Sequence, residues 1–204
     1  MRFAILTIFL TVGIVALAQD PSIQLDSIDV ALADIATHAK NYPPTFSSKA
    51  QREEVKEKLR GIIKLLDSAV ANHPDDRDLL LRNGFANSMG HNLDFEGCAQ
   101  KSANVYEHLL TLRPTDEEAN YHYGAFLGGV GRPKESIEYL LKAVELGSTE
   151  AHYSLAISYL MLEDKQSACS HLRIYVSQYP KDNDAKKLLA AVDNDNLKFE
   201  RKEE

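Results

Sequence analysis

Apolar residues recur at the spacing of an α-helix along most of the chain after residue 18. The clearest stretch lies in residues 52–72, where apolar positions follow at steps of four, three, four and three: Val55, Leu59, Ile62, Leu66 and Ala69. These steps place the side chains in one stripe on an otherwise charged helix. No segment shows the alternation of a half-buried strand. The pattern therefore predicts an all-α protein.

A second amphipathic stretch, residues 27–40, precedes this helix and is separated from it by Pro43 and Pro44. Proline at this point ends one helix before the next begins. Residues 27–74 are therefore predicted to form a helical hairpin.

Three further segments, residues 77–116, 117–148 and 149–182, carry a related pattern. Equivalent positions in the three segments hold the small residues Gly84, Gly124 and Ala156, which are 40 and 32 residues apart. These intervals bracket the period of about 34 residues typical of one helix-turn-helix repeat. The extra length of the first interval is assigned to an inserted loop at 89–97, where a connection can grow at little entropic cost.

Small residues are predicted where the two helices of a hairpin cross. Gly124 should face Ser136, and Ala156 should face Ala168, so that the backbones approach closely. Residues Thr115 to Glu118 have the form of a capping box at the start of a helix. Residues 183–192 place Ala185, Leu188, Leu189 and Val192 on one stripe, as expected of a helix that caps the last repeat. A polar tail, 193–204, follows.

The repeated segments resemble the tetratricopeptide repeat (TPR) family, clearly over residues 77–182 and by helix pattern over 27–74. The best match is the third segment, with Tyr123-Gly124, Leu127, Gly131-Arg132-Pro133, Ser136-Ile137, Leu140, Ala143-Val144 and Leu146. The resemblance implies a short right-handed α-solenoid over residues 19–192, with a capping helix at its end.

The resemblance also implies a function in binding another protein or peptide, because the first helix of each pair lines a concave surface. Carried over by position, the groove-facing residues are Asp78, Leu81, Arg82, Phe85, Met89, Glu118, Tyr121, His122, Ala125, Glu150, Tyr153, Ile157 and Met161. Tyr121 and Tyr153 are expected to stack along the groove and to suit an extended or helical peptide. The family's peptide clamp uses Lys, Asn and Arg to bind a terminal carboxylate, and only Arg82 of this chain resembles a part of it. No preference for a peptide with a free C-terminus is therefore expected.

The N-terminus has the pattern of a secretory signal. Met1 and Arg2 are followed by an uncharged apolar run, residues 3–18, that ends in Ala16-Leu17-Ala18. This small-x-small ending predicts cleavage after Ala18 and export. An uncleaved anchor is the alternative, although the run is shorter than the roughly 20 residues that span a bilayer. The resemblance favours the bacterial periplasm, with secretion as the alternative.

The charge of the chain bears on its partners. The formal net charge is −7, and removal of Arg2 with the signal makes it −8. An acidic chain repels phosphate groups, so nucleic acid and anionic membrane surfaces are disfavoured.

One segment could carry chemistry. Residues 89–98 hold His91, Asp94, Glu96 and Cys98. Their spacing matches no zinc or calcium loop, but an enzyme or metal-binding protein centred on this segment remains the alternative function. Self-association into a homo-oligomer is a third possibility.

No cofactor is predicted. Cys98 and Cys169 are interpreted as small buried residues, with a disulfide as the alternative.

Overall fold

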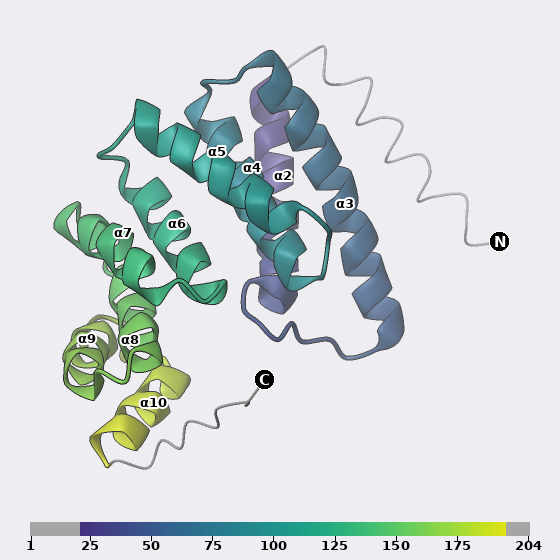
Figure 1. Cartoon of the computed structure of the whole chain (residues 1–204). Helices are drawn as coiled ribbons and strands as arrows, with labels where there is room; N and C mark the ends of the chain where they lie inside the picture. Colours follow the sequence, from purple (N-terminus) through teal and green to yellow (C-terminus); the bar gives the residue numbers. More distant parts are fainter. Residues whose placement is uncertain (1–20, 195–204) are drawn as a thin grey trace.

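The computed structural model describes residues 21–194, which form helices joined by short turns and contain no strand (Figure 1). The prediction of an all-α fold is confirmed. The helices are α2 (Pro21–Ala39), α3 (Lys49–Asn72), α4 (Arg77–Asn92), α5 (Cys98–Leu112), α6 (Glu117–Gly129), α7 (Pro133–Glu145), α8 (Ala151–Met161), α9 (Lys165–Gln178) and α10 (Asn183–Asp193). The predicted signal peptide, 1–18, and most of the polar tail lie outside the described residues.

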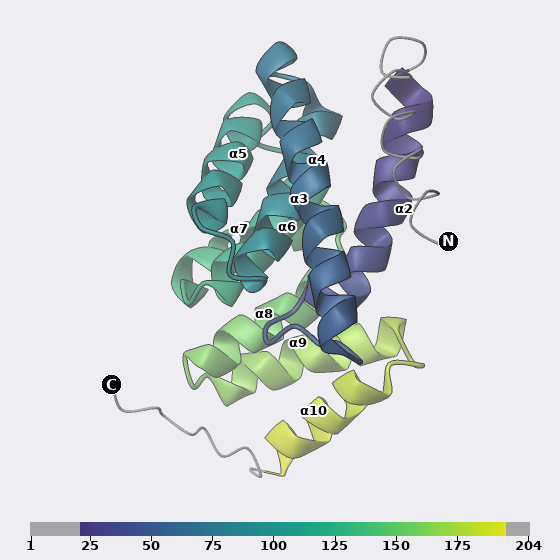
Figure 2. The same ribbon diagram turned by 90° about the vertical axis from the view of Figure 1, so that its right-hand side faces the viewer.

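The helices pair as hairpins, α4 with α5, α6 with α7 and α8 with α9, and the hairpins stack into a solenoid (Figure 2). Neighbouring first helices also contact each other, in the order α2, α4, α6, α8. No comparable contacts join α5, α7 and α9 within the described part of the chain. The stack therefore curves toward its first helices, and we call the surface formed by α2, α4, α6 and α8 the concave face.

The hairpins cross at glycine and serine. Ser136 Oγ donates a hydrogen bond of 2.7 Å to the carbonyl oxygen of Gly124, and Ser102 Oγ donates one of 3.0 Å to that of Gly84. A Cβ atom on Gly124 would lie 2.7 Å from Leu140 Cγ. The predicted contact between Gly124 and Ser136 is therefore confirmed. The backbones approach closely because a glycine leaves the room and a buried hydroxyl fills it.

Helices α4, α6 and α10 share a capping device. Asp76, Asp116 and Asp182 each stand two residues after a proline, and each side chain accepts hydrogen bonds from backbone N–H groups at the start of α4, α6 or α10. Such caps satisfy donors that the helix leaves unpaired. The prediction of a capping box beginning at Thr115 was wrong by one residue, because Asp116 is the N-cap and accepts from the N–H of Ala119.

The N-terminal hairpin is wider than the others. Helices α2, α3 and α4 share one hydrophobic core, in which Leu32, Leu59 and Met89 are buried. In α3 the inward residue is Ile63, whereas Ile62, which was placed on the stripe, is half-buried at its edge. Helices α2 and α3 each contact α4 more than they contact one another.

The insertion predicted at 89–97 is partly helical. Helix α4 continues to Asn92 and α5 begins at Cys98, so only residues 93–97 form a connection. Met89 and Leu93 are fully buried in the core shared with α2 and α3. Their burial stabilises the last turn of α4, so the extra residues lengthen this helix as well as the connection that follows it.

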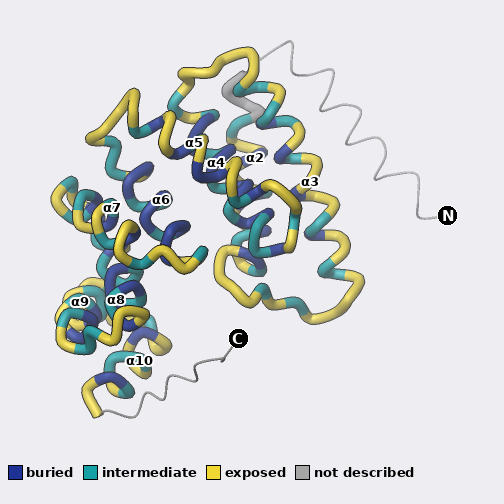
Figure 3. The backbone as a smooth tube through the Cα atoms, viewed as in Figure 1, coloured by how far each residue is buried: buried dark blue, intermediate teal, exposed yellow. Residues whose placement is uncertain are grey.

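Figure 3 shows buried positions concentrated along α4, α6 and α8, the helices enclosed by their neighbours. Cys98 and Cys169 are both buried and free, in agreement with their interpretation as small apolar residues. Among the described residues, no helix has the length and hydrophobicity needed to cross a membrane.

We predict that Gly124→Ala lowers the free energy of unfolding by about 1–3 kcal/mol, because the new methyl group collides with Leu140. Gly129→Ala is the matched control, since it is in the same helix and has no neighbour within 4 Å. The control should leave stability unchanged or raise it by up to about 1 kcal/mol. Urea denaturation of both variants measures the difference, and equal effects would contradict the proposed close contact.

Candidate functional site

A cavity of about 280 Å³ opens on the concave face between α2, α4 and α6. Polar and apolar side chains contribute to it from all three helices. It is lined by Asp29, Leu32, Ala33, Arg77, Asp78, Leu81, Arg82, Phe85, Glu118 and His122. Because α2, α4 and α6 are the first helices of successive hairpins, the cavity lies where the solenoid's curvature brings them together.

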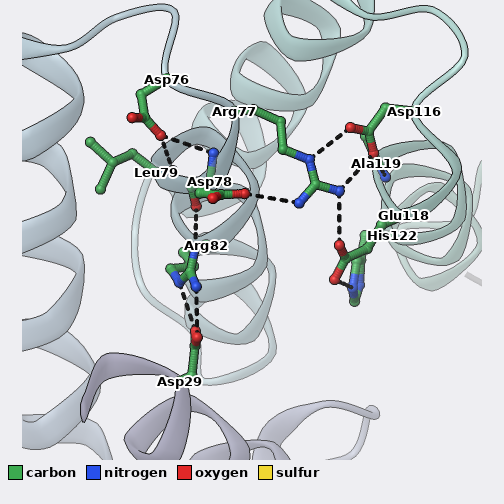
Figure 4. A network of polar contacts seen from close by, with 10 residues as sticks. All are labelled: Asp29, Asp76, Arg77, Asp78, Leu79, Arg82, Asp116, Glu118, Ala119 and His122. Atoms are coloured by element: carbon green, nitrogen blue, oxygen red, sulfur yellow. Dashed lines mark hydrogen bonds and ion pairs between the residues drawn. The ribbon is translucent and has the colours of Figure 1, made fainter. Parts of the chain in front are cut away.

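Arg82 binds Asp29 across the cavity (Figure 4). Its Nε and Nη2 donate to the two carboxylate oxygens of Asp29 at 2.7 and 2.6 Å. Its Nη1 donates to the carbonyl oxygen of Asp78 at 3.0 Å. This paired geometry is the strongest arrangement for a guanidinium and a carboxylate. It ties α2 to α4, and each of the three guanidinium nitrogens of Arg82 donates a hydrogen bond.

Arg77 is surrounded by three carboxylates. It donates to both oxygens of Asp116, at 2.8 and 3.1 Å, to Glu118 at 2.9 Å and to Asp78 at 3.0 Å. Burial alone would raise the pKa of Asp116, but the hydrogen bonds from Arg77 and from the N–H of Ala119 hold that pKa below its ordinary value. Arg77 therefore joins α4 to α6 through the residue that caps α6.

His122 is neutral at physiological pH. Its ring lies between those of Phe85 and Tyr121, with centroid distances of 5.0 Å to each. Burial, and then the charges of Lys40 and Arg77, lower the pKa of His122 to about 4. The imidazole thus acts as a flat wall of the cavity.

Six of the sequence-predicted site residues line this cavity: Asp78, Leu81, Arg82, Phe85, Glu118 and His122. Two of the predicted groove residues are buried. Met89 is fully buried because α2 and α3 enclose it, and it does not face the groove. Leu81 is 7% exposed, since it packs beside Tyr106 in the next core cluster, and it contributes only to the floor of the cavity.

The remaining predicted residues lie farther along the solenoid, on α6, α8 and the turn before α8. Tyr121 is half-buried, with Lys40 Nζ 6.0 Å from its ring centroid. Tyr153 packs on Tyr175, at 5.2 Å between centroids. The two tyrosines thus contact other rings and not each other. Ala125 and Ile157 are partly exposed, whereas Glu150 and Met161 are exposed.

The sequence did not point to the site residues of α2, to Lys40 directly after it, or to Arg77. Asp29, Ala33 and Arg77 line the cavity, and Lys40 Nζ lies over the ring of Tyr121. The residues of α2 could have been found from sequence, because residues 27–40 were predicted to form the first helix of the first pair. In the structure this helix contacts α4. The positional rule applied to α4, α6 and α8 applies to α2 as well.

The segment 89–98 does not assemble a catalytic pair. The ring of His91 lies edge-on to Phe126, 6.5 Å away, whereas Cys98 lines a separate cavity of about 400 Å³ with residues of α3, α5 and the 93–97 turn. Burial raises the pKa of the Cys98 thiol, which disfavours a thiolate nucleophile. Among the residues that the structure describes, no group of three or more His, Cys, Asp or Glu side chains is placed to hold a metal.

Comparison with solved structures places this architecture. One similar structure is a double mutant of MamA from RS-1, which has a TM-score of 0.60 and 22% sequence identity. The match covers 72% of this chain and 80% of the MamA chain. TTC0263, a thermophilic TPR protein of Thermus thermophilus, has a TM-score of 0.59 at 17% identity, covering 90% and 96%. This chain has the tetratricopeptide-repeat fold.

Another TPR structure, YrrB, described as having an unusual peptide-binding site, has a TM-score of 0.55 at 18% identity and covers 66% of this chain and 67% of its own. No family model matches the sequence. The aspartyl/asparaginyl β-hydroxylases of Mus musculus and Homo sapiens are 29% identical over 103 residues. The match covers 50% of this chain but only 13% of the hydroxylases.

We predict that Asp116→Asn lowers the free energy of unfolding of this TPR fold by about 1–2 kcal/mol at pH 7, because the amide still caps α6 but loses its charge against Arg77. The pKa of Asp116 is depressed in the folded state, so this contribution is complete above the ordinary value of 3.8 and is lost as pH falls through the folded value. The gap between variant and wild type should therefore close in acid.

The matched control is Asp76→Asn, which alters a cap that makes two backbone hydrogen bonds at the start of α4. Asn and Asp are nearly equivalent as caps, so its cost should stay below about 0.5 kcal/mol. Chemical denaturation between pH 3 and pH 7 provides the measurement. An Asp116→Asn effect that is as small as the control, or that does not change with pH, would contradict the pairing.

Proposed function

We propose that this protein is an exported, non-catalytic adaptor or assembly factor that holds a segment of a partner protein against its concave face. The observation that carries the proposal is the cavity between α2, α4 and α6, which is lined by the half-buried rings of Phe85 and His122. The half-buried ring of Tyr121 lies 5.0 Å from that of His122. Partly exposed aromatic rings on rigid helices give contact area at a small entropic cost, which suits peptide recognition.

Two further observations support the proposal. YrrB, which shares the fold, is described as a TPR protein with a peptide-binding site. The pattern of residues 1–18 supports export, and we propose the bacterial periplasm as the place of action. The match to the β-hydroxylases covers too little of those proteins to carry their activity to this chain.

The alternative function, an enzyme or metal site in residues 89–98, is weakened by the same geometry. Cys98 is buried, and its pKa is raised by that burial. His91 packs against Phe126. We therefore assign residues 89–98 a structural role, in which Met89 and Leu93 complete the core shared by α2, α3 and α4.

A photoreactive phenylalanine analogue at Tyr121 tests the proposal in an extract of the native envelope. We expect it to crosslink one abundant partner protein, and the crosslink should be lost when Tyr153→Ala is added. The control places the same analogue at Leu141, an exposed apolar residue of α7, which is a second helix. Circular dichroism checks that the variants are folded. Capture of only a second copy of the chain, or equal capture from Leu141, would contradict binding at the concave face.

Once the partner segment is captured, a second test asks whether a free C-terminal carboxylate contributes to its binding. Because Arg82 is engaged by Asp29 and Arg77 by Asp116 and Glu118, neither guanidinium is available for a C-terminal carboxylate. Synthetic peptides of that segment with free and with amidated C-termini should bind within about twofold of each other, less than one charged hydrogen bond would contribute. Isothermal titration calorimetry measures both, and a strong loss on amidation would show that a carboxylate is recognised.

A further inference from the structure

The charges around the cavity differ in exposure. The side chains of Arg82 and Arg77 are 19% and 29% exposed, whereas those of Asp29, Asp78 and Glu118 are 48%, 55% and 47% exposed. The fourth carboxylate, that of Asp116, is only 9% exposed, so three of the four carboxylates are more exposed than either guanidinium group. A ligand that approaches from solvent meets carboxylate oxygens before it meets any cation.

The network also carries an excess of negative charge. Four carboxylates, those of Asp29, Asp78, Asp116 and Glu118, surround the two guanidinium groups. Asp29 neutralises Arg82 and Asp116 neutralises Arg77 through paired hydrogen bonds. The charges of Asp78 and Glu118 are thus left over. Lys40, whose charge also reaches His122, reduces the excess to one and does not cancel it.

The rest of the cavity is apolar. Leu32, Ala33, Leu81 and Phe85 contribute hydrocarbon, and the neutral ring of His122 adds a flat face. The volume of about 280 Å³ lies below the roughly 300–1,000 Å³ of sites that enclose a drug-sized molecule. A single long side chain with an apolar stem and a charged end fits such a cavity better than a whole small molecule.

We propose that this cavity binds one lysine or arginine side chain of the partner segment. The aliphatic stem lies along Leu32, Ala33 and Phe85, and the cationic end sits between the outward-facing carboxylates of Asp78 and Glu118. This inference rests on the proposed function, and it adds the chemistry of the partner: the segment is basic at this position. An acidic segment would meet like charge at the mouth of the cavity and would be rejected.

The test uses a minimal probe and needs no knowledge of the partner. Nα-acetyl-lysine methylamide is titrated into ¹⁵N-labelled protein at low salt, and its neutral analogue Nα-acetyl-norleucine methylamide serves as the comparison. We expect saturable shifts of the amide signals of Ala33, Leu81 and Phe85 with the lysine probe, and none with norleucine. Added salt should weaken the lysine response, because the mouth of the cavity is exposed. No shift, or equal shifts with both probes, would overturn the inference.

Two variants sharpen the test. Asp78→Asn with Glu118→Gln removes the excess charge but keeps the shape and the acceptor oxygens, and it should weaken the lysine probe roughly fivefold to tenfold. Glu135→Gln is the matched control, since Glu135 also pairs with an arginine, Arg132, but lies on α7 outside the cavity. Equal effects of the two changes would overturn the inference.

The two proposals can fail separately. If the captured partner segment still binds with full affinity after every lysine and arginine is changed to norleucine, the basic subsite is wrong and binding at the concave face stands. If the lysine probe binds as expected but no partner crosslinks at Tyr121, the cavity is cation-binding and the adaptor function is wrong.

Discussion

The structure depends on how closely the two helices of a hairpin approach. In two hairpins the contact consists of a glycine on the first helix and a buried serine on the second, joined by a hydrogen bond to the glycine carbonyl oxygen. A side chain at Gly84 or Gly124 would collide with Tyr106 or Leu140. Because these hairpins are narrow, their first helices can also contact one another, and the stack curves toward them. The concave face follows from this packing.

Helix α2 then gives that face its chemistry. It belongs to a wide hairpin, packs on α4 and places Asp29 opposite Arg82. Arg77 extends the network to α6 through Asp116, which caps that helix. The network links three helices, and three of its four carboxylates, those of Asp29, Asp78 and Glu118, are more exposed than its two guanidinium groups. The interactions that fix the relative positions of α2, α4 and α6 therefore also present negative charge and an apolar floor to a ligand.

The all-α fold and the small residues at the crossings were predictable from sequence, because both depend on local periodicity and on steric room. The burial of Met89 was not, since it depends on α2 and α3 enclosing α4. Nor was that of Leu81, which depends on packing beside Tyr106 in the cluster formed with α5 and α6. The same is true of the 89–97 segment, where two buried apolar residues, Met89 and Leu93, extend a helix. Asp78, Arg82 and Glu118 were recognised as site residues. The exposure of their side chains was not predictable, because it depends on contacts with Asp29 and Asp116, which lie elsewhere in the chain.

The central claim is that the partner occupies the concave face. Hydrogen–deuterium exchange of the chain with and without its captured partner tests this claim most directly. Slower exchange confined to residues 21–39, 77–92, 117–129 and 151–161, the first helices α2, α4, α6 and α8, is the result that the account predicts. Slower exchange confined to the second helices α5, α7 and α9, or to residues 93–97 and the cavity beside Cys98, would contradict it.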